Sequence, residues 1–123
     1  MQQVDRARIK ELRAWAKENI AQREVYHSGL GNLIKFTMTG IKEYLNQPHE
    51  FYNEKNELIT DIQRIIECSE YMGFVTFKNR ISHIFEIKIN EKNSWLIAND
   101  HQGRGITLYS ISDSAKVLTD ITK

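Results

Sequence analysis

The sequence predicts an α+β domain in which N-terminal helices pack on a three- to four-stranded antiparallel sheet, followed by a C-terminal helix. In the first half, apolar residues recur at intervals of three and four, which is the period of an amphipathic helix. In the second half, three short runs of strand-forming residues are separated by turn formers. Such short connections favour an antiparallel meander, because parallel crossovers need a dozen or more residues. We expect the 123 residues to form a single domain, with residues 1–23 as an N-terminal helix and 24–123 as the α+β core.

The first elements are a helix, a turn and a short strand. Apolar residues spaced for one buried helical stripe occur within residues 4–20, namely Ile9, Leu12, Trp15, Ala16 and Ile20. The sequence HSGLGN, residues 27–32, contains two glycines and an asparagine, which indicates a turn. Residues 33–37 then form a short run typical of a strand.

Two further helices are predicted before the meander. Thr39 is expected to cap a short helix that ends near Gln47, because Pro48 disfavours helical geometry in the residue before it. Residues 53–70 show the period of a second amphipathic helix, which Gly73 is expected to end.

The C-terminal part is predicted to contain three strands and one helix. The strands are expected at residues 82–90, 94–99 and 105–112, joined by the turn sequences NEKN and DHQGRG. Asp113 is then in position to cap a last helix.

Composition excludes several classes of protein. The formal net charge is only +1, which argues against a protein that coats nucleic acid by charge alone and leaves a local basic patch open. The single cysteine, Cys68, excludes an internal disulfide and a cysteine-based zinc cluster. The four histidines are widely separated, and no nucleotide-binding or hydrolase motif is present. We therefore expect no metal and no cofactor.

No apolar run approaches the roughly 18 residues needed to span a bilayer, and residues 1–20 lack the apolar core of an export signal. We expect a soluble protein in the cytoplasm of a bacterial host, with no membrane partner.

His83 is the first candidate for chemistry. It opens the alternating run HIFEIKIN and shares its parity with Phe85, Ile87 and Ile89. Packing at the margin of the core is the simpler interpretation. The alternative is that His83 projects from the strand end into a cleft, where a pKa near neutrality suits proton transfer.

The last predicted strand is unusually rich in hydroxyls, which come from Thr107, Tyr109, Ser110 and Ser112. They are typical of an edge strand facing water. Alternatively, one of them donates a hydrogen bond to a phosphate oxygen during RNA cleavage.

Basic residues supply the remaining candidates. Lys35 and Lys42 belong to the first predicted strand and the helix that follows it, either as solvated charges or as groups that converge on a phosphate. His27, in the first turn, is a second candidate acid or base. Arg104 lies in the last hairpin, where it can touch a nucleic-acid backbone.

The runs IKFTMTGIKEYLNQPHEFYNEKNELI, SHIFEIKIN, SWLIA and LYSISDS resemble small domains of phage and mobile-element proteins, including large polyvalent proteins. These domains are grouped with the barnase, EndoU, colicin and RelE-like nucleases. The resemblance covers roughly residues 24–120 and is carried mainly by GIKEYLNQPH and YSISDS. It implies N-terminal helices on a four-stranded antiparallel sheet, and metal-independent ribonuclease activity.

The resemblance also implies site residues by position. His27 and Lys35 would fill the N-terminal role, His83 the sheet role, and Tyr109 with Ser110 the role of the last strand. The leading hypothesis is a metal-independent ribonuclease-like domain that cleaves RNA by general acid/base catalysis, with substrate contacts from the residues Lys42, Arg104 and Thr107. The alternative is a non-catalytic, phage-encoded binding protein or an inhibitor of a host defence or toxin system. RNA and a protein partner, either an immunity protein or a host target, are the expected partner classes.

Overall fold

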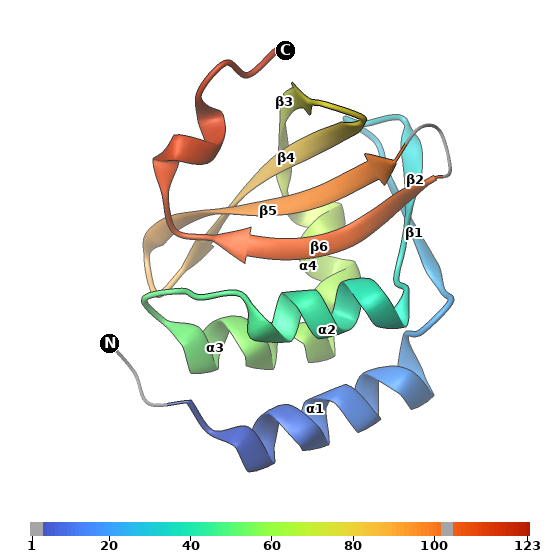
Figure 1. Cartoon of the computed structure of the whole chain (residues 1–123), viewed down its shortest axis with the longest axis vertical. Coiled ribbons are helices and arrows are strands. Elements are labelled where there is room, and N and C mark those ends of the chain that lie inside the picture. The colour runs from blue at the N-terminus through green and yellow to red at the C-terminus, as the bar shows by residue number, and fades with distance from the viewer. Residues whose placement is uncertain (1–3, 102–104) are drawn as a thin grey trace.

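The computed structural model describes residues 4–101 and 105–123, and it confirms the α+β class (Figure 1). The helical elements are α1 (Arg6–Asn19), α2 (Met38–Asn46), α3 (Tyr52–Glu57), α4 (Ile62–Cys68) and the 3₁₀ helices η1 (Leu58–Asp61) and η2 (Ala115–Leu118). The strands are β1 (Glu24–His27), β2 (Asn32–Lys35), β3 (Glu70–Phe77), β4 (Arg80–Ile89), β5 (Lys92–His101) and β6 (Ile106–Ser112).

The sheet has six strands in the order β1-β2-β6-β5-β4-β3. Strands β3 to β6 form an antiparallel meander, which confirms the predicted connection of the last three strands. The prediction of three or four strands, all antiparallel, is wrong. The β1–β2 hairpin joins the meander through a parallel pairing of Ile34 with Ile106 and of Lys35 with Thr107.

The helix expected over residues 53–70 is broken into α3, η1 and α4, and it ends at Cys68. Gly73 does not end a helix. It lies within β3, which the sequence analysis missed because Glu70–Phe77 follows the helical pattern without an intervening turn sequence. The stripe of the predicted helix is nevertheless buried, at Ile59, Ile62 and Ile66.

Two predicted caps also differ. Thr37, not Thr39, caps α2, because its hydroxyl accepts the N–H of Gly40. The expected C-terminal helix is the single 3₁₀ turn η2, which is capped by Ser114. Asp113 instead accepts the N–H of Glu50, which ties the end of β6 to the segment between α2 and α3.

Helices cover one face of the sheet, called here the inner face, and in Figure 1 they lie below it. The apolar core lies between them, with α1, α2 and α4 on one side and the inner-face residues Val25, Ile34, Phe85, Leu96, Ala98 and Leu108 on the other. Helix α2 lies directly on the backbone of β6, since a Cβ on Gly40 would lie 2.1 Å from the carbonyl oxygen of Leu108. The opposite face, called the outer face, is the side that the α-helices leave uncovered; part of it is crossed by the C-terminal segment with η2.

A fully buried lysine holds the end of α2 against α3. The Lys55 ammonium donates to the carbonyl oxygens of Tyr44 (2.5 Å) and Gln47 (2.6 Å). It also lies 5.0 Å and 4.8 Å from the ring centroids of Tyr44 and Tyr52, within the range of cation–π attraction. The Tyr44 hydroxyl donates in return to the carbonyl oxygen of Lys55. Burial lowers the pKa of Lys55 to about 7.

Lys55→Met should remove a pH dependence of stability. The ordinary lysine pKa is 10.5, so between pH 7 and that value the unfolded chain binds a proton that folded Lys55 releases. Raising the pH therefore favours the folded state, by up to about 1.4 kcal/mol per pH unit. Urea unfolding of both proteins at several pH values should show the wild type gaining stability relative to the variant above pH 7. An unchanged difference across this window would show that Lys55 titrates normally.

Candidate functional site

The structure distributes the predicted site residues over both faces of the sheet. His27 and His83 lie on the inner face, because they point to the same side of their strands as the core residues Val25 and Phe85. Lys35 and Thr107 are cross-strand partners on the outer face, and Ser110 pairs with Ile97 on that same face. Arg104 lies outside the described residues.

His27 is buried at the end of β1 and not exposed in a turn, with 3% of its surface accessible. Its Nδ1 accepts the N–H of Leu30 (3.1 Å), and its Nε2 therefore carries the proton and donates to the carbonyl oxygen of Ser69 (2.8 Å). The ring packs edge-on against Phe85, with centroids 4.8 Å apart. Both nitrogens are thus occupied by backbone groups, and the imidazole fastens the first turn to the start of β3.

His83 and His27 lie on either side of Tyr71. The Tyr71 ring centroid is 6.4 Å from that of His27 and 5.8 Å from that of His83. The Tyr71 hydroxyl and Nδ1 of His83 are 2.8 Å apart. Burial raises the pKa of Tyr71 and lowers that of His83, so a protonated phenol donates to a neutral imidazole. The two histidines flank a shared aromatic cluster, and the Tyr71 ring separates them.

A polar row crosses the outer face in direct register. It runs from β1 to β3 through the residues Glu24, Lys35, Thr107, Asn99, Ser82 and Val75. The Ser82 hydroxyl donates to Oδ1 of Asn99 (2.8 Å), and Asn99 is buried. Lys35 and Thr107, predicted from opposite halves of the chain, are therefore brought side by side.

The other two last-strand candidates lie farther along β6. Tyr109 is the extra residue of a bulge opposite Ile97 and Ala98, and its hydroxyl accepts from Nε2 of Gln47 (3.1 Å). Ser110 is buried, and its hydroxyl makes a long contact of 3.5 Å with the carbonyl oxygen of Ile111. Lys42 is exposed on α2, beneath the sheet.

Sequence reasoning missed a second row on the outer face, two residues along each strand from the polar row. Tyr26 pairs with Leu33 on the hairpin, and Phe77 pairs with Arg80 at the opposite edge of the sheet. Tyr26 and Phe77 are each 56% exposed, which is unusual for aromatic side chains in a sheet. Lys78 Nζ lies 5.4 Å and Arg80 Cζ 5.6 Å from the Phe77 ring centroid. In the sequence, these exposed rings are indicated only by the alternation of side chains in EVYH and FVTF. That alternation can be interpreted only once β1 and β3 are known to be strands.

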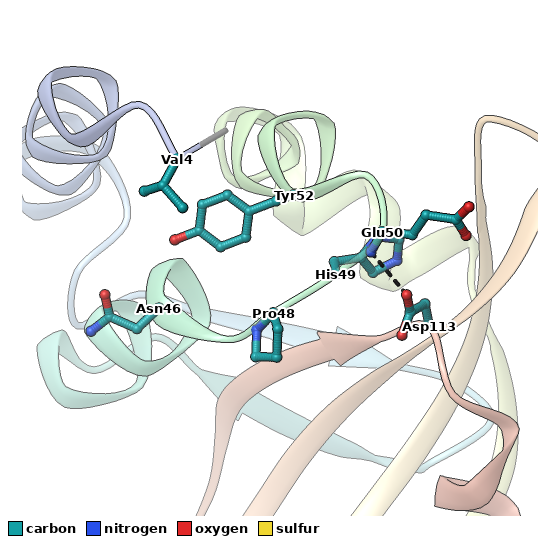
Figure 2. A pocket seen from close by; sticks show the side chains of 7 residues that line it. All are labelled: Val4, Asn46, Pro48, His49, Glu50, Tyr52 and Asp113. Carbon is teal, nitrogen blue, oxygen red and sulfur yellow. Dashed lines mark hydrogen bonds between the residues drawn. The ribbon is translucent and has the colours of Figure 1, made fainter. Parts of the chain in front are cut away.

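A cavity of about 550 Å³ lies elsewhere, between the α2–α3 segment and the end of β6 (Figure 2). Its walls come from Val4, Asn46, Pro48, His49, Glu50, Tyr52 and Asp113. Most of its polar groups already hold the chain together. The Tyr52 hydroxyl donates to the carbonyl oxygen of Leu45, Asp113 accepts the N–H of Glu50, and the carboxylate of Glu50 pairs with Lys92.

His49 lines this cavity and lies within hydrogen-bonding distance of Ser94, as in a catalytic serine–histidine pair. However, the imidazole nitrogen that faces the serine carries the proton, so it cannot activate the hydroxyl as a nucleophile. Its Nδ1 accepts the N–H of Phe51 (2.8 Å), so Nε2 carries the proton and donates to the Ser94 hydroxyl (2.9 Å). Burial lowers the pKa of His49, which keeps the ring neutral. A general base must accept the serine proton, and here the histidine donates instead. The contact therefore fixes the α2–α3 segment to β5.

Within residues 4–101 and 105–123, no three His, Cys, Asp or Glu side chains are grouped so as to share a metal ion. The helices in these ranges are too short or too polar to cross a membrane.

Comparison with known proteins gives one match. Residues 4–109 match the family model of large polyvalent protein-associated domain 3, which confirms the part of the resemblance that pointed to phage and mobile-element proteins. The match gives no support for a nuclease family. Neither the curated proteins nor the solved structures contain a match to this chain. Because the family model covers most of the sequence, the chain belongs to the large polyvalent protein-associated domain 3 family.

Proposed function

We propose that this domain binds single-stranded RNA on the outer face of its sheet and does not cleave it. The observation that carries the proposal is the row with two exposed aromatic rings, Tyr26 on β1 and Phe77 on β3. These strands are the two edges of a six-stranded sheet, so the rings are separated by up to about 24 Å at the usual strand spacing. Aromatic rings presented on an open sheet are the stacking surface that single-stranded bases use.

The charges around these rings favour a nucleic acid over a protein partner. Lys35 lies in the adjacent row, and Lys78 and Arg80 lie close to the Phe77 ring. Lysine is depleted at protein–protein interfaces, whereas it supplies the phosphate contacts of most nucleic-acid interfaces. The net charge of +1 is compatible with this local patch, because binding depends on the cations near the phosphates.

Three of the four histidines favour binding without catalysis. In His27 and in His49, both ring nitrogens make hydrogen bonds that hold the fold together. The third histidine, His83, lies on the inner face, on the opposite side of β4 from Ser82 and the polar row. The outer face supplies aromatic rings, cations and hydroxyls for binding. It also carries the fourth histidine, the exposed His101 at the end of β5, which pairs with Arg80 and to which we assign a binding role.

Single-ring substitutions test the binding surface. Tyr26→Ala and Phe77→Ala should each weaken the affinity for an unstructured RNA of about ten nucleotides by about 5- to 150-fold, because one stacked base contributes about 1–3 kcal/mol. Fluorescence anisotropy at fixed low salt measures the affinity. Val4→Ala is a matched control, since Val4 is 54% exposed but lines the cavity near α2 and α3. Equal RNA affinities for the wild type and all three variants would show that the outer face does not bind RNA.

The absence of cleavage is a separate prediction. Total RNA incubated in EDTA with excess protein should remain intact, and His83→Ala should leave it equally intact. Gel electrophoresis of the RNA over several hours provides the readout. Metal-independent cleavage that disappears in a folded His83→Ala protein would instead establish the ribonuclease hypothesis.

A further inference from the structure

The C-terminal residues 113–123, called here the strap, cross the outer face after β6. In Figure 1 the strap rises from the end of β6 through η2 toward β3. It ends by pairing with the edge of β3, where Phe74 and Thr122 exchange two backbone hydrogen bonds of 2.8 Å. Gly73, with φ +124°, permits this close approach, because a Cβ would lie 2.3 Å from the carbonyl oxygen of Thr122.

A solvent-open cavity of about 260 Å³ lies between the strap and the sheet. The apolar side chains of Val75, Ile84 and Ile97 come from the sheet, and Val117 comes from the strap. Ligand cavities usually measure about 300–1,000 Å³, so this one suits a small ligand or one end of a larger one.

The polar side of the cavity is cationic. Arg80 from β4 and Lys116 from the strap both line it, and no Asp or Glu is among its described lining residues. The Nε of Arg80 is buried and has no hydrogen-bond partner in the part of the chain that the structure describes. Asn99 also lines the cavity, and its Oδ1 accepts from Ser82, which leaves the amide nitrogen as a donor. A buried guanidinium donor without an acceptor points to a missing anion.

We propose that this cavity binds a phosphate monoester, with Arg80 and Lys116 on the phosphate oxygens and the attached organic group against the apolar wall. Arginine matches phosphate geometry with two parallel hydrogen bonds. Two cations without a carboxylate favour a phosphate monoester, which carries a charge of about −1.5 to −2 at neutral pH, over a singly charged carboxylate.

The phosphate has two possible sources, a free nucleotide or the terminal phosphate of an RNA strand. The second source rests on the proposed RNA binding and deepens it, since Arg80 is also in the row that contains Phe77. The first source is independent of it.

Isothermal titration calorimetry on the full chain tests the site with a nucleoside 5′-monophosphate, the matching nucleoside, a 5′-phosphorylated RNA and the same RNA without the phosphate. We expect the phosphorylated member of at least one pair to bind at least tenfold more tightly than its partner. The pair that shows the difference identifies the source. Equal binding within both pairs, including no binding, would overturn the proposal.

Variants assign the effect to the cavity. Arg80→Gln and Lys116→Gln should each abolish most of the preference for the phosphorylated ligand. Lys88→Gln is the matched control, because Lys88 is exposed on the same face of β4 but does not line the cavity. Thermal unfolding verifies that the variants are folded, which Arg80→Gln should remain because the Arg80 Nε has no described partner to lose.

The outcome also separates this inference from the proposed function. If Arg80→Gln weakens RNA with and without a 5′-phosphate equally, Arg80 contacts the strand elsewhere and the cavity proposal fails while RNA binding stands. If RNA does not bind but the nucleotide does so through Arg80, the cavity proposal stands and the proposed function fails.

Discussion

The parallel pairing of β2 with β6 is the contact on which the arrangement of this domain depends. It involves only two residue pairs, Ile34 with Ile106 and Lys35 with Thr107, yet it joins the N-terminal hairpin to the C-terminal meander. This register aligns the polar row across the outer face. It also places Ile34 in the core opposite α2, so the hydrophobic core and the outer face are set by the same pairing. A shift of one residue would exchange the two faces of β2.

Because helices occupy the inner face, polar side chains there serve the fold. His27 and His49 each accept a backbone N–H at Nδ1 and donate from Nε2, although they lie in different segments. Lys55 similarly satisfies two carbonyl oxygens at the end of α2. Such buried polar groups are stable only when they are fully hydrogen-bonded, and that requirement competes with proton transfer to a substrate. Two buried polar atoms lack a partner among the described residues. Asn56 Oδ1 is on α3, and Arg80 Nε is on the other side of the sheet, where it lines a cavity.

Local patterns in the sequence were sufficient for part of this structure. The period of α1 and the alternation of β4 predicted these elements, and His83 does share a face with Phe85 in the core. Strand β3 was missed because its residues directly follow α4, and β1 because four residues carry too weak a pattern.

The roles of single residues depended on contacts between distant segments. The burial of His27 depends on a hydrogen bond to Ser69, 42 residues away. Likewise, the outer-face rows required the register of β2 on β6, which no local pattern specifies. Lys35 and Thr107 could be selected as polar candidates, but their adjacency could not be derived.

The central claim is that the outer face, and not the surroundings of His27, His49 and His83, contacts the ligand. Backbone amide NMR during titration with a short single-stranded RNA maps that contact directly. The account predicts that the largest shift changes fall on Tyr26, Leu33 and Lys35 of the hairpin and on Phe77, Lys78 and Arg80 of the opposite edge. Changes confined to the cavity beside His49, or to the surroundings of Tyr71 and His83 on the inner face, would contradict it.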